Sequence, residues 1–265
     1  MTSDKTTRVL LTLDCDQPDA DLLKAIVALA DEHEIEVTGL FVEDEDLLNA
    51  ARLPGLSEVS ISTGEVTRLS ADQMEAQVVG QAQRARRQFE STARGLNLKF
   101  SFEVARGRTA ETVARAATAS DIVVVSRALR AAGLRARRGS HFEPIVEQHS
   151  NLLFVNEPWA SGKTVIVLCE SSASPCERAL AVAGRIAERE QVELLIAVPS
   201  GYANADLPAG DRRVELEAWS ETAIAELCER EHARLLVVPP TQRLEWRTLL
   251  INIIDRVPCS LLRLD

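Results

Sequence analysis

Short apolar runs alternate along the chain with segments whose apolar residues recur every three or four positions. The run at residues 8–14 is apolar and ends on a carboxylate, and residues 19–32 repeat apolar residues at helical spacing. Residues 36–42 form the next apolar run. Strands that alternate with helices predict βαβ units, right-handed crossovers and a mostly parallel sheet.

The same order of elements returns in the second part of the chain. Residues 163–170 form an apolar run that ends on Glu170, which overlays Asp14 of the first run. A segment with helical spacing follows Pro175, and residues 192–198 read as the next strand. The pattern therefore predicts an internal duplication.

The ends of the two repeats also match, so the duplication covers most of the chain. Residues 119–125 correspond to 233–238, and the closing run 151–155 corresponds to 260–264. Residues 156–162 are rich in turn-forming residues and join the repeats. We expect two tandem domains, which span residues 1–157 and 163–265.

The two domains differ in length. The first carries an insertion at residues 43–70 and a polar helix at residues 71–94 that leads to a strand at 99–104. The second is abbreviated, and its matching region reads as a loop, a short strand and a helix over residues 200–210, 211–216 and 217–231.

Composition excludes several classes of protein. The chain has 265 residues, 46% hydrophobic residues and a net charge of −10, which argues against a general nucleic-acid binder. No apolar run approaches the roughly 20 residues that span a bilayer, and residues 1–5 lack the apolar core of a signal peptide. We expect a soluble cytoplasmic protein with neither nucleic acid nor membrane as a partner.

The five cysteines are odd in number and include no Cys-x-x-Cys pair. This spacing favours reduced, packed thiols over a disulfide framework or a zinc site. The four histidines are scattered and have no ligand spacing with cysteine or carboxylate residues, so we expect neither a metal site nor a catalytic triad.

Three motifs, in addition to the strand–carboxylate–helix opening, resemble the universal stress protein family. They are Val-Thr-Gly-Leu-Phe-Val-Glu at residues 37–43, Ser-Asp-Ile-Val-Val-Val at 120–125 and Val-Pro-Cys-Ser-Leu-Leu at 257–262. The last is similar to the family's closing Ala-Pro-Cys-Pro-Val-Leu-Val-Val pattern. The resemblance covers nearly the whole chain, and the duplication makes the chain resemble a tandem member.

The resemblance implies a fold and a mode of pairing. Each domain would be an open, parallel five-stranded α/β sandwich with sheet order 3-2-1-4-5 and helices on both faces. Family members pair as dimers, and tandem members often pair their halves within one chain. We expect an intramolecular pseudo-dimer through the final strands, near residues 152–153 and 261–262, with a homodimer as a further option.

Many members of the family bind ATP through a Gly-x2-Gly-x9-Gly-Ser/Thr pattern after the fourth strand. Here Ser126 takes the place of the first glycine and Leu129 that of the second, while Gly139-Ser140 matches the closing pair after a one-residue adjustment near Gly133. The resemblance thus gives a set of candidate residues for binding ATP, ADP or AMP in the first domain. These are Thr12, Asp14, Val42, Ser126, Arg127, Gly133, Gly139 and Ser140.

The departures from the glycine pattern leave two interpretations of the loop at residues 127–138. Glycine lets backbone N–H groups approach phosphate closely, and Leu129 would restrict that approach. The five arginines of this loop either hold a polyanion through forked donors or coat an exposed loop. Asp14 has a second interpretation too, as a cap of the following turn. In the second domain Pro239-Pro240 starts the loop and no glycine follows, so we expect no nucleotide site there.

Two further segments have alternative interpretations. Residues 161–164, Ser-Gly-Lys-Thr, look like the end of a P-loop, but Glu157 stands where its first glycine belongs and the motif precedes a strand. In the insertion at residues 43–70, acids precede an apolar stripe at Leu47, Leu48 and Ala51. The stripe predicts either a capped helix over the sheet edge or a lid or partner-docking element.

Three functional hypotheses follow. The favoured one is a non-enzymatic regulatory or binding protein of the bacterial-type stress response, with a degraded nucleotide site and a protein partner that the sequence does not identify. The second is a protein that binds ATP or AMP in the first domain and hydrolyses ATP slowly if at all. The third is an assembly scaffold with no ligand.

Overall fold

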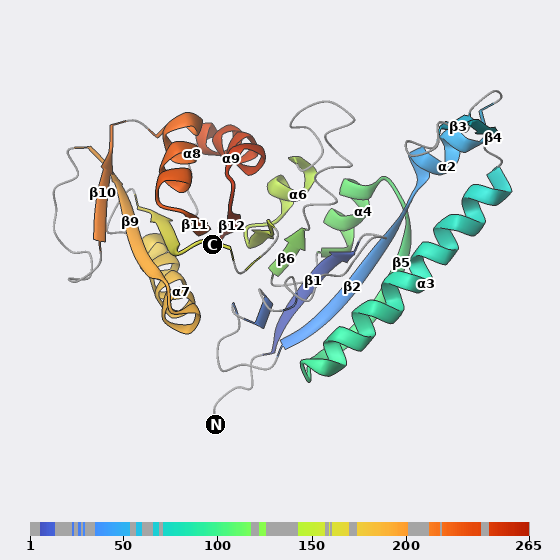
Figure 1. The fold of residues 1–265 in the computed structure, drawn as a ribbon, viewed down its shortest axis with the longest axis horizontal. Coiled ribbons are helices and arrows are strands. Elements are labelled where there is room, and N and C mark those ends of the chain that lie inside the picture. The colour runs from blue at the N-terminus through green and yellow to red at the C-terminus, as the bar shows by residue number, and fades with distance from the viewer. Residues whose placement is uncertain are drawn as a thin grey trace.

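The computed structural model describes residues 6–13, 23, 26–27, 29, 35–53, 57–59, 66–68, 71–117, 122–125, 143–156, 159, 161–169, 174–200, 212–217, 219–239 and 244–264. One ten-stranded sheet runs through both halves of the chain in the order β10-β9-β8-β11-β12-β7-β6-β1-β2-β5 (Figure 1). The strands of the first half are β1 (Thr7–Leu13), β2 (Ile35–Asp44), β5 (Lys99–Gly107), β6 (Ile122–Val125) and β7 (Leu152–Phe154). Those of the second half are β8 (Thr164–Leu168), β9 (Glu193–Pro199), β10 (Arg212–Leu216), β11 (Ala233–Val238) and β12 (Ser260–Arg263).

Within each half all the strand pairs are parallel, and the order is 3-2-1-4-5 when the strands are numbered along that half. The predicted fold class is therefore confirmed. The central strands are covered on both faces, which explains why they are continuous apolar runs. All five residues of β8 are buried, as are the last three of β6.

Helices cover the two faces of the sheet. On one face lie α3 (Ala71–Gly95) and α7 (Ser174–Glu190), and on the other α4 (Thr109–Ala116), α6 (Glu143–Gln148), α8 (Glu221–Arg230) and α9 (Leu244–Arg256). Side chains alternate between the faces along each strand, so Val165 and Val167 join one core while Ile166 and Leu168 join the other. Each core runs through both halves of the chain.

The two halves meet through their final strands. β7 pairs with β12 antiparallel, in the register Leu152↔Arg263, Leu153↔Leu262 and Phe154↔Leu261. Leu153 and Leu262 are equivalent in the repeat, so an approximate two-fold axis passes between them. Beside this pair, the Ser260 hydroxyl accepts a hydrogen bond from the backbone N–H of Asn156 at 2.9 Å.

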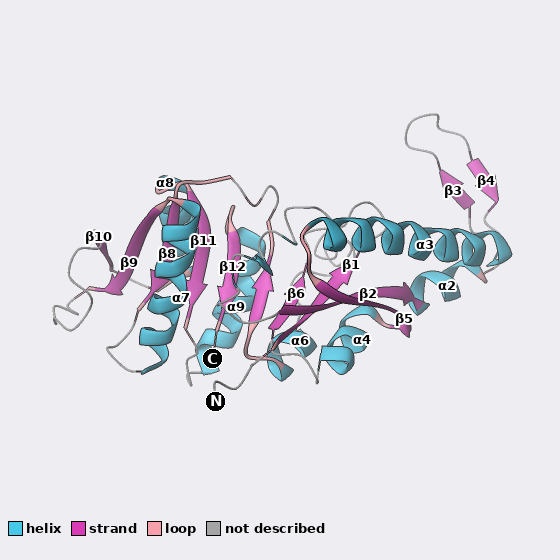
Figure 2. Ribbon diagram, turned by 90° about the horizontal axis from the view of Figure 1, so that it is seen from below, coloured by secondary structure: helices cyan, strands magenta, loops and turns pink. Residues whose placement is uncertain are grey.

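The insertion after β2 holds more structure than its sequence pattern predicts. It contains the helix α2 (Glu45–Ala51) and an antiparallel hairpin of β3 (Ser57–Val59) and β4 (Val66–Arg68), which lies beyond the ends of α2 and α3 (Figure 2). Asp44 caps α2 by accepting hydrogen bonds from the N–H groups of Asp46 and Leu47. The expected apolar stripe is wrong in one position, because Leu48 and Ala51 are buried whereas Leu47 is 47% exposed.

Gly162 has a structural role in the Ser-Gly-Lys-Thr motif at residues 161–164, which looks like the end of a P-loop. The residue has a φ of +97°, and a Cβ added to it would lie 2.6 Å from the backbone N of Arg234. The N–H of Lys163 donates to the carbonyl of His232 at 2.8 Å, and the hydroxyl of Thr164 donates to the carbonyl of Glu231. The motif therefore joins the start of β8 to the start of β11 through the Lys163 N–H and the Thr164 hydroxyl.

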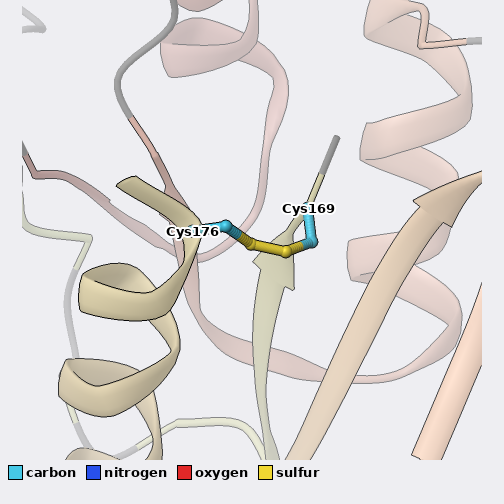
Figure 3. Close-up of a disulfide and its surroundings, with 2 residues drawn as sticks. All are labelled: Cys169 and Cys176. Carbon is cyan, nitrogen blue, oxygen red and sulfur yellow. A yellow bond between two sulfur atoms is a disulfide. The ribbon is translucent and has the colours of Figure 1, made fainter. Parts of the chain in front are cut away.

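The expectation of reduced thiols is wrong for two cysteines. Cys169 and Cys176 form a disulfide, with their Cα atoms 5.9 Å apart (Figure 3). The spacing of seven residues did not reveal this pair, because the bridge depends on the end of β8 and the first turn of α7 lying close together in the fold. Cys228 and Cys259 are free and buried as expected, and Cys15 lies outside the described residues.

Candidate functional site

The candidate site of the first half lies where its strand order reverses. β1 and β6 are neighbours, with Leu11 in register with Val124, and they end at Leu13 and Val125. In open α/β sheets, ligands bind outside the carboxyl ends of the strands at such a switch point. The residues proposed for the loops that follow lie outside the described residues. These are Asp14, Ser126, Arg127, Gly133, Gly139 and Ser140.

Thr12 lies at this switch point and its hydroxyl group already has a partner. The side chain is fully buried, and its Oγ1 donates a hydrogen bond of 3.1 Å to the backbone carbonyl of Val124. This bond joins β1 to β6. A buried hydroxyl that is hydrogen-bonded within the sheet adds to its stability and has little freedom to turn toward a ligand.

Val42 lies on the neighbouring strand, on the same face of the sheet as Thr12. Thr12 is in register with Leu40, two residues before Val42, and side chains two positions apart share a face. Val42 is half-buried and packs against the core that contains Leu10 and Leu40. The structure thus brings these two candidates onto adjacent strands, Val42 nearer the carboxyl edge.

A network of charged side chains lies at the carboxyl ends of β2 and β5. The sequence did not predict this network. Arg106 donates to the Glu43 carboxylate at 2.8 Å, and it also lies 3.6 Å from Glu75 of α3. Glu75 is in turn 3.6 Å from Arg52. The hydrogen bond that Arg106 donates to Glu43 is the largest cause that raises the pKa of Arg106. These partners lie far apart in sequence, so only the order of the strands could have revealed the network.

The N-terminus of α4 adjoins this network. The hydroxyl of Thr109 donates to the second carboxylate oxygen of Asp44 at 3.3 Å. Gly107, just before the helix, has a φ of +152°, and a Cβ there would lie 2.5 Å from the hydroxyl oxygen of Thr112. At the carboxyl edge of β2 and β5, Glu43, Arg106, Glu75 and Arg52 are therefore paired with one another.

The second half has different chemistry at its switch point. β8 and β11 are neighbours there, and Cys169 and Pro239 directly follow them. Pro239 is buried and has no backbone N–H to donate to a phosphate. Cys169 is engaged in the disulfide with Cys176.

The described part of the chain contains neither a cluster of metal-binding side chains nor a helix suited to cross a membrane. No three histidine, cysteine or carboxylate side chains in it are grouped as they would be around a metal ion. None of its helices combines the length and the apolar character that a membrane span requires.

Solved structures share this arrangement of strands and helices. A universal stress protein from Archaeoglobus fulgidus DSM 4304 superposes with a TM-score of 0.60 at 13% identity, covering 97% of each chain. The fold is that of the universal stress proteins. A putative universal stress protein from Pseudomonas aeruginosa UCBPP-PA14 superposes with a TM-score of 0.56 at 12% identity, covering 98% of this chain and 94% of the other. In sequence, no family model and no curated protein matches the chain.

The universal stress protein fold explains the geometry of the site. The coverage of 97% means that both halves, not one, share the arrangement of the archaeal protein. Sequence identity of 12–13% leaves side chains free to differ, so the site residues have to be judged from this chain's own contacts.

Proposed function

We propose that this chain is a universal-stress-like regulatory protein that acts in the cytoplasm through protein contacts and not through catalysis. In this proposal the first half carries a degraded nucleotide site, and the second half carries none. The β7–β12 pairing takes the place of the dimer that single-domain members form. The protein partner would belong to a bacterial-type stress response.

The observation that carries the proposal is the hydrogen bond from Thr12 to Val124. Because of this bond, the Thr12 hydroxyl, a candidate for binding a ligand, is already hydrogen-bonded within the sheet. The sequence adds Ser126 and Leu129 in place of two glycines, and the second half has Pro239 where a backbone donor would be needed. Pro239 removes a backbone donor, and the side chain of Leu129 restricts the close approach of backbone N–H groups to a phosphate.

A second candidate function is the binding of ATP, ADP or AMP by the first half. It is favoured by the switch point between β1 and β6, where the arginine-rich loop at residues 127–138 begins two residues after β6 ends. Arginine provides forked donors that suit phosphate oxygens. In this case the arginines would replace the contacts that glycine N–H groups make elsewhere.

Titration of the purified protein with ATP, ADP and AMP separates the two functions. A nucleotide present at 100 times its Kd stabilises the folded state by about 2.7 kcal/mol, which calorimetry and thermal shift both detect. The regulatory proposal predicts no heat of binding and no shift in Tm up to millimolar nucleotide. A saturable shift with one of the three nucleotides would replace it with the second candidate.

Two variants refine this test. If a nucleotide binds, Gly139→Trp should abolish binding. Its free energy of unfolding should fall by less than that of a variant with a substitution in the hydrophobic core. Thr12→Val should lower the free energy of unfolding by about 0.5–1.5 kcal/mol and leave nucleotide binding unchanged, because its hydroxyl serves Val124. Thr38→Val is the matched control, since the Thr38 hydroxyl shares an exposed hydrogen bond with Ser101. Lost affinity in Thr12→Val alone would show that Thr12 contacts the ligand.

A further inference from the structure

The disulfide of the second half lies at its switch point. Cys169 directly follows β8, and Cys176 is the third residue of α7. Figure 3 shows the bond crossing from the end of the strand to the first turn of the helix. The bridge therefore ties the end of β8 to the start of α7 at the place where an open α/β sheet would bind a ligand.

The two sulfur atoms have different chemical surroundings. Cys176 lies in the first turn of α7, where the positive end of the helix dipole stabilises a thiolate. Cys169 follows a fully buried strand and has no helix N-terminus of its own. Cys176 is therefore the better leaving group when the bond is broken, and an attacking thiolate should join Cys169.

The other two described cysteines provide an internal contrast. The hydrogen bond with Cys259 is the largest cause that raises the pKa of the Cys228 thiol well above its ordinary value, and burial raises it further. Both residues lie in the core on the opposite face of the sheet. Burial and the raised pKa make the Cys228 thiol a poor nucleophile.

We propose that Cys169–Cys176 is a redox-responsive bridge that low-molecular-weight thiols such as glutathione open and close. One glutathione thiolate attacks the sulfur of Cys169, the S–S bond breaks, and Cys176 leaves as a thiolate that takes up a proton. A second glutathione thiolate attacks the glutathione sulfur of the mixed disulfide and releases Cys169. Two glutathione molecules are oxidised to one glutathione disulfide, and the protein gains two thiols.

Reduction should loosen one end of α7 and leave the other in place. Cys169 and Cys176 are 1% and 3% exposed, so a thiol reaches the bond only when the structure around it opens locally. Further along the helix, Ala183 and Ile186 are buried in the core. Near its end, Arg189 donates a hydrogen bond to the backbone carbonyl of Val27 in the first half.

The test equilibrates the intact protein with mixtures of reduced and oxidised glutathione over a wide range of ratios. After acid quenching and denaturation, N-ethylmaleimide labels the free thiols and mass spectrometry counts and locates them. We expect Cys169 and Cys176 to gain labels together as the reduced fraction rises. The double variant Cys228→Ser/Cys259→Ser should give the same titration. A bridge that stays closed in the folded protein at every ratio, or two thiols that never join, would overturn the proposal.

Hydrogen exchange on the same samples tests the structural consequence. On reduction, amide exchange in the second turn of α7, whose N–H groups bond to the carbonyls of the first turn, should accelerate at least tenfold, whereas exchange around Ile186 should not change. Equal acceleration along the whole helix would mean that the bridge stabilises the domain without acting as a local switch. Because this test uses the wild-type chain, it does not depend on whether a cysteine variant folds.

Discussion

Gly162→Ala tests the assignment of the segment before β8 to a structural role. At φ +97° an L-residue is strained, and backbone strain of this kind costs about 1–3 kcal/mol. The new Cβ would also lie 2.6–2.8 Å from backbone atoms of Ala233 and Arg234, which cannot swing away as side chains do. Overpacking adds about 1–3 kcal/mol. We therefore expect the free energy of unfolding to fall by about 2–6 kcal/mol.

Urea denaturation followed by circular dichroism measures this change. Gly184→Ala is the matched control: Gly184 lies inside α7, and a Cβ there would meet nothing within 4 Å. Alanine is the better helix former by about 0.8–1.0 kcal/mol, so the control should be slightly more stable than the wild type. The same substitution thus has opposite signs at the two positions.

An unchanged free energy of unfolding in Gly162→Ala would refute the structural role. The P-loop interpretation makes a different prediction, in which the variant folds normally and loses nucleotide binding. Comparing stability and binding in one variant therefore separates the two interpretations. Arg234 forms a partly buried ion pair with Glu190 and also donates a hydrogen bond to the carbonyl of Gly162, so we expect a shift of this segment to disturb these contacts too.

Three further predictions concern the interface, the ionic pairs and the disulfide. Leu153→Ala and Leu262→Ala should each lower the free energy of unfolding by about 2–5 kcal/mol. Each variant should unfold in urea in a single transition, because the two halves unfold together, and two separate transitions would contradict this. The hydrogen bond from Arg86 lowers the pKa of Glu90, so its stabilisation is present above the ordinary value of 4.5 and is lost as the pH falls through the lowered pKa. The difference in Tm between wild type and Glu90→Gln should therefore shrink as the pH falls below about 4.5, and a constant difference would exclude the effect. Reduction of the disulfide, which closes a separation of 7 residues, should lower the free energy of unfolding by about 2.5 kcal/mol in matched oxidised and reduced melts, and equal melts would rule out this contribution.

The sequence predicted the elements whose pattern is long and local. The buried run of β8 and the 25-residue helix α3 repeat a signal over many positions, and both lie close to their expected bounds. The β3–β4 hairpin was missed because each of its strands has three residues, too few to establish a period of two. The helix α4 (Thr109–Ala116) was missed as well.

The candidate site was harder to predict because its contacts are distant in sequence. The bond from Thr12 to Val124 joins residues 112 positions apart, and the pair of Glu43 and Arg106 joins residues 63 positions apart. A residue's type shows that it can donate or accept, but not which partner satisfies it. The family pattern gave Thr12 a role toward a ligand, whereas the fold gives its hydroxyl a partner inside the sheet.

The interface between the halves argues for pairing within one chain. An exact repeat would place the same side chains on both sides of the axis between Leu153 and Leu262. The next residue of each half differs, however, because Phe154 of the first half is equivalent to Arg263 of the second. Arg263 donates to the carbonyl of Val146 in the first half at 2.9 Å, a bond that Phe154 cannot return. Two copies of the first half would lack this bond, and two copies of the second would bring two arginines to the axis. Since each half carries what the other lacks, the interface fits the two halves to one another better than either half to its own copy.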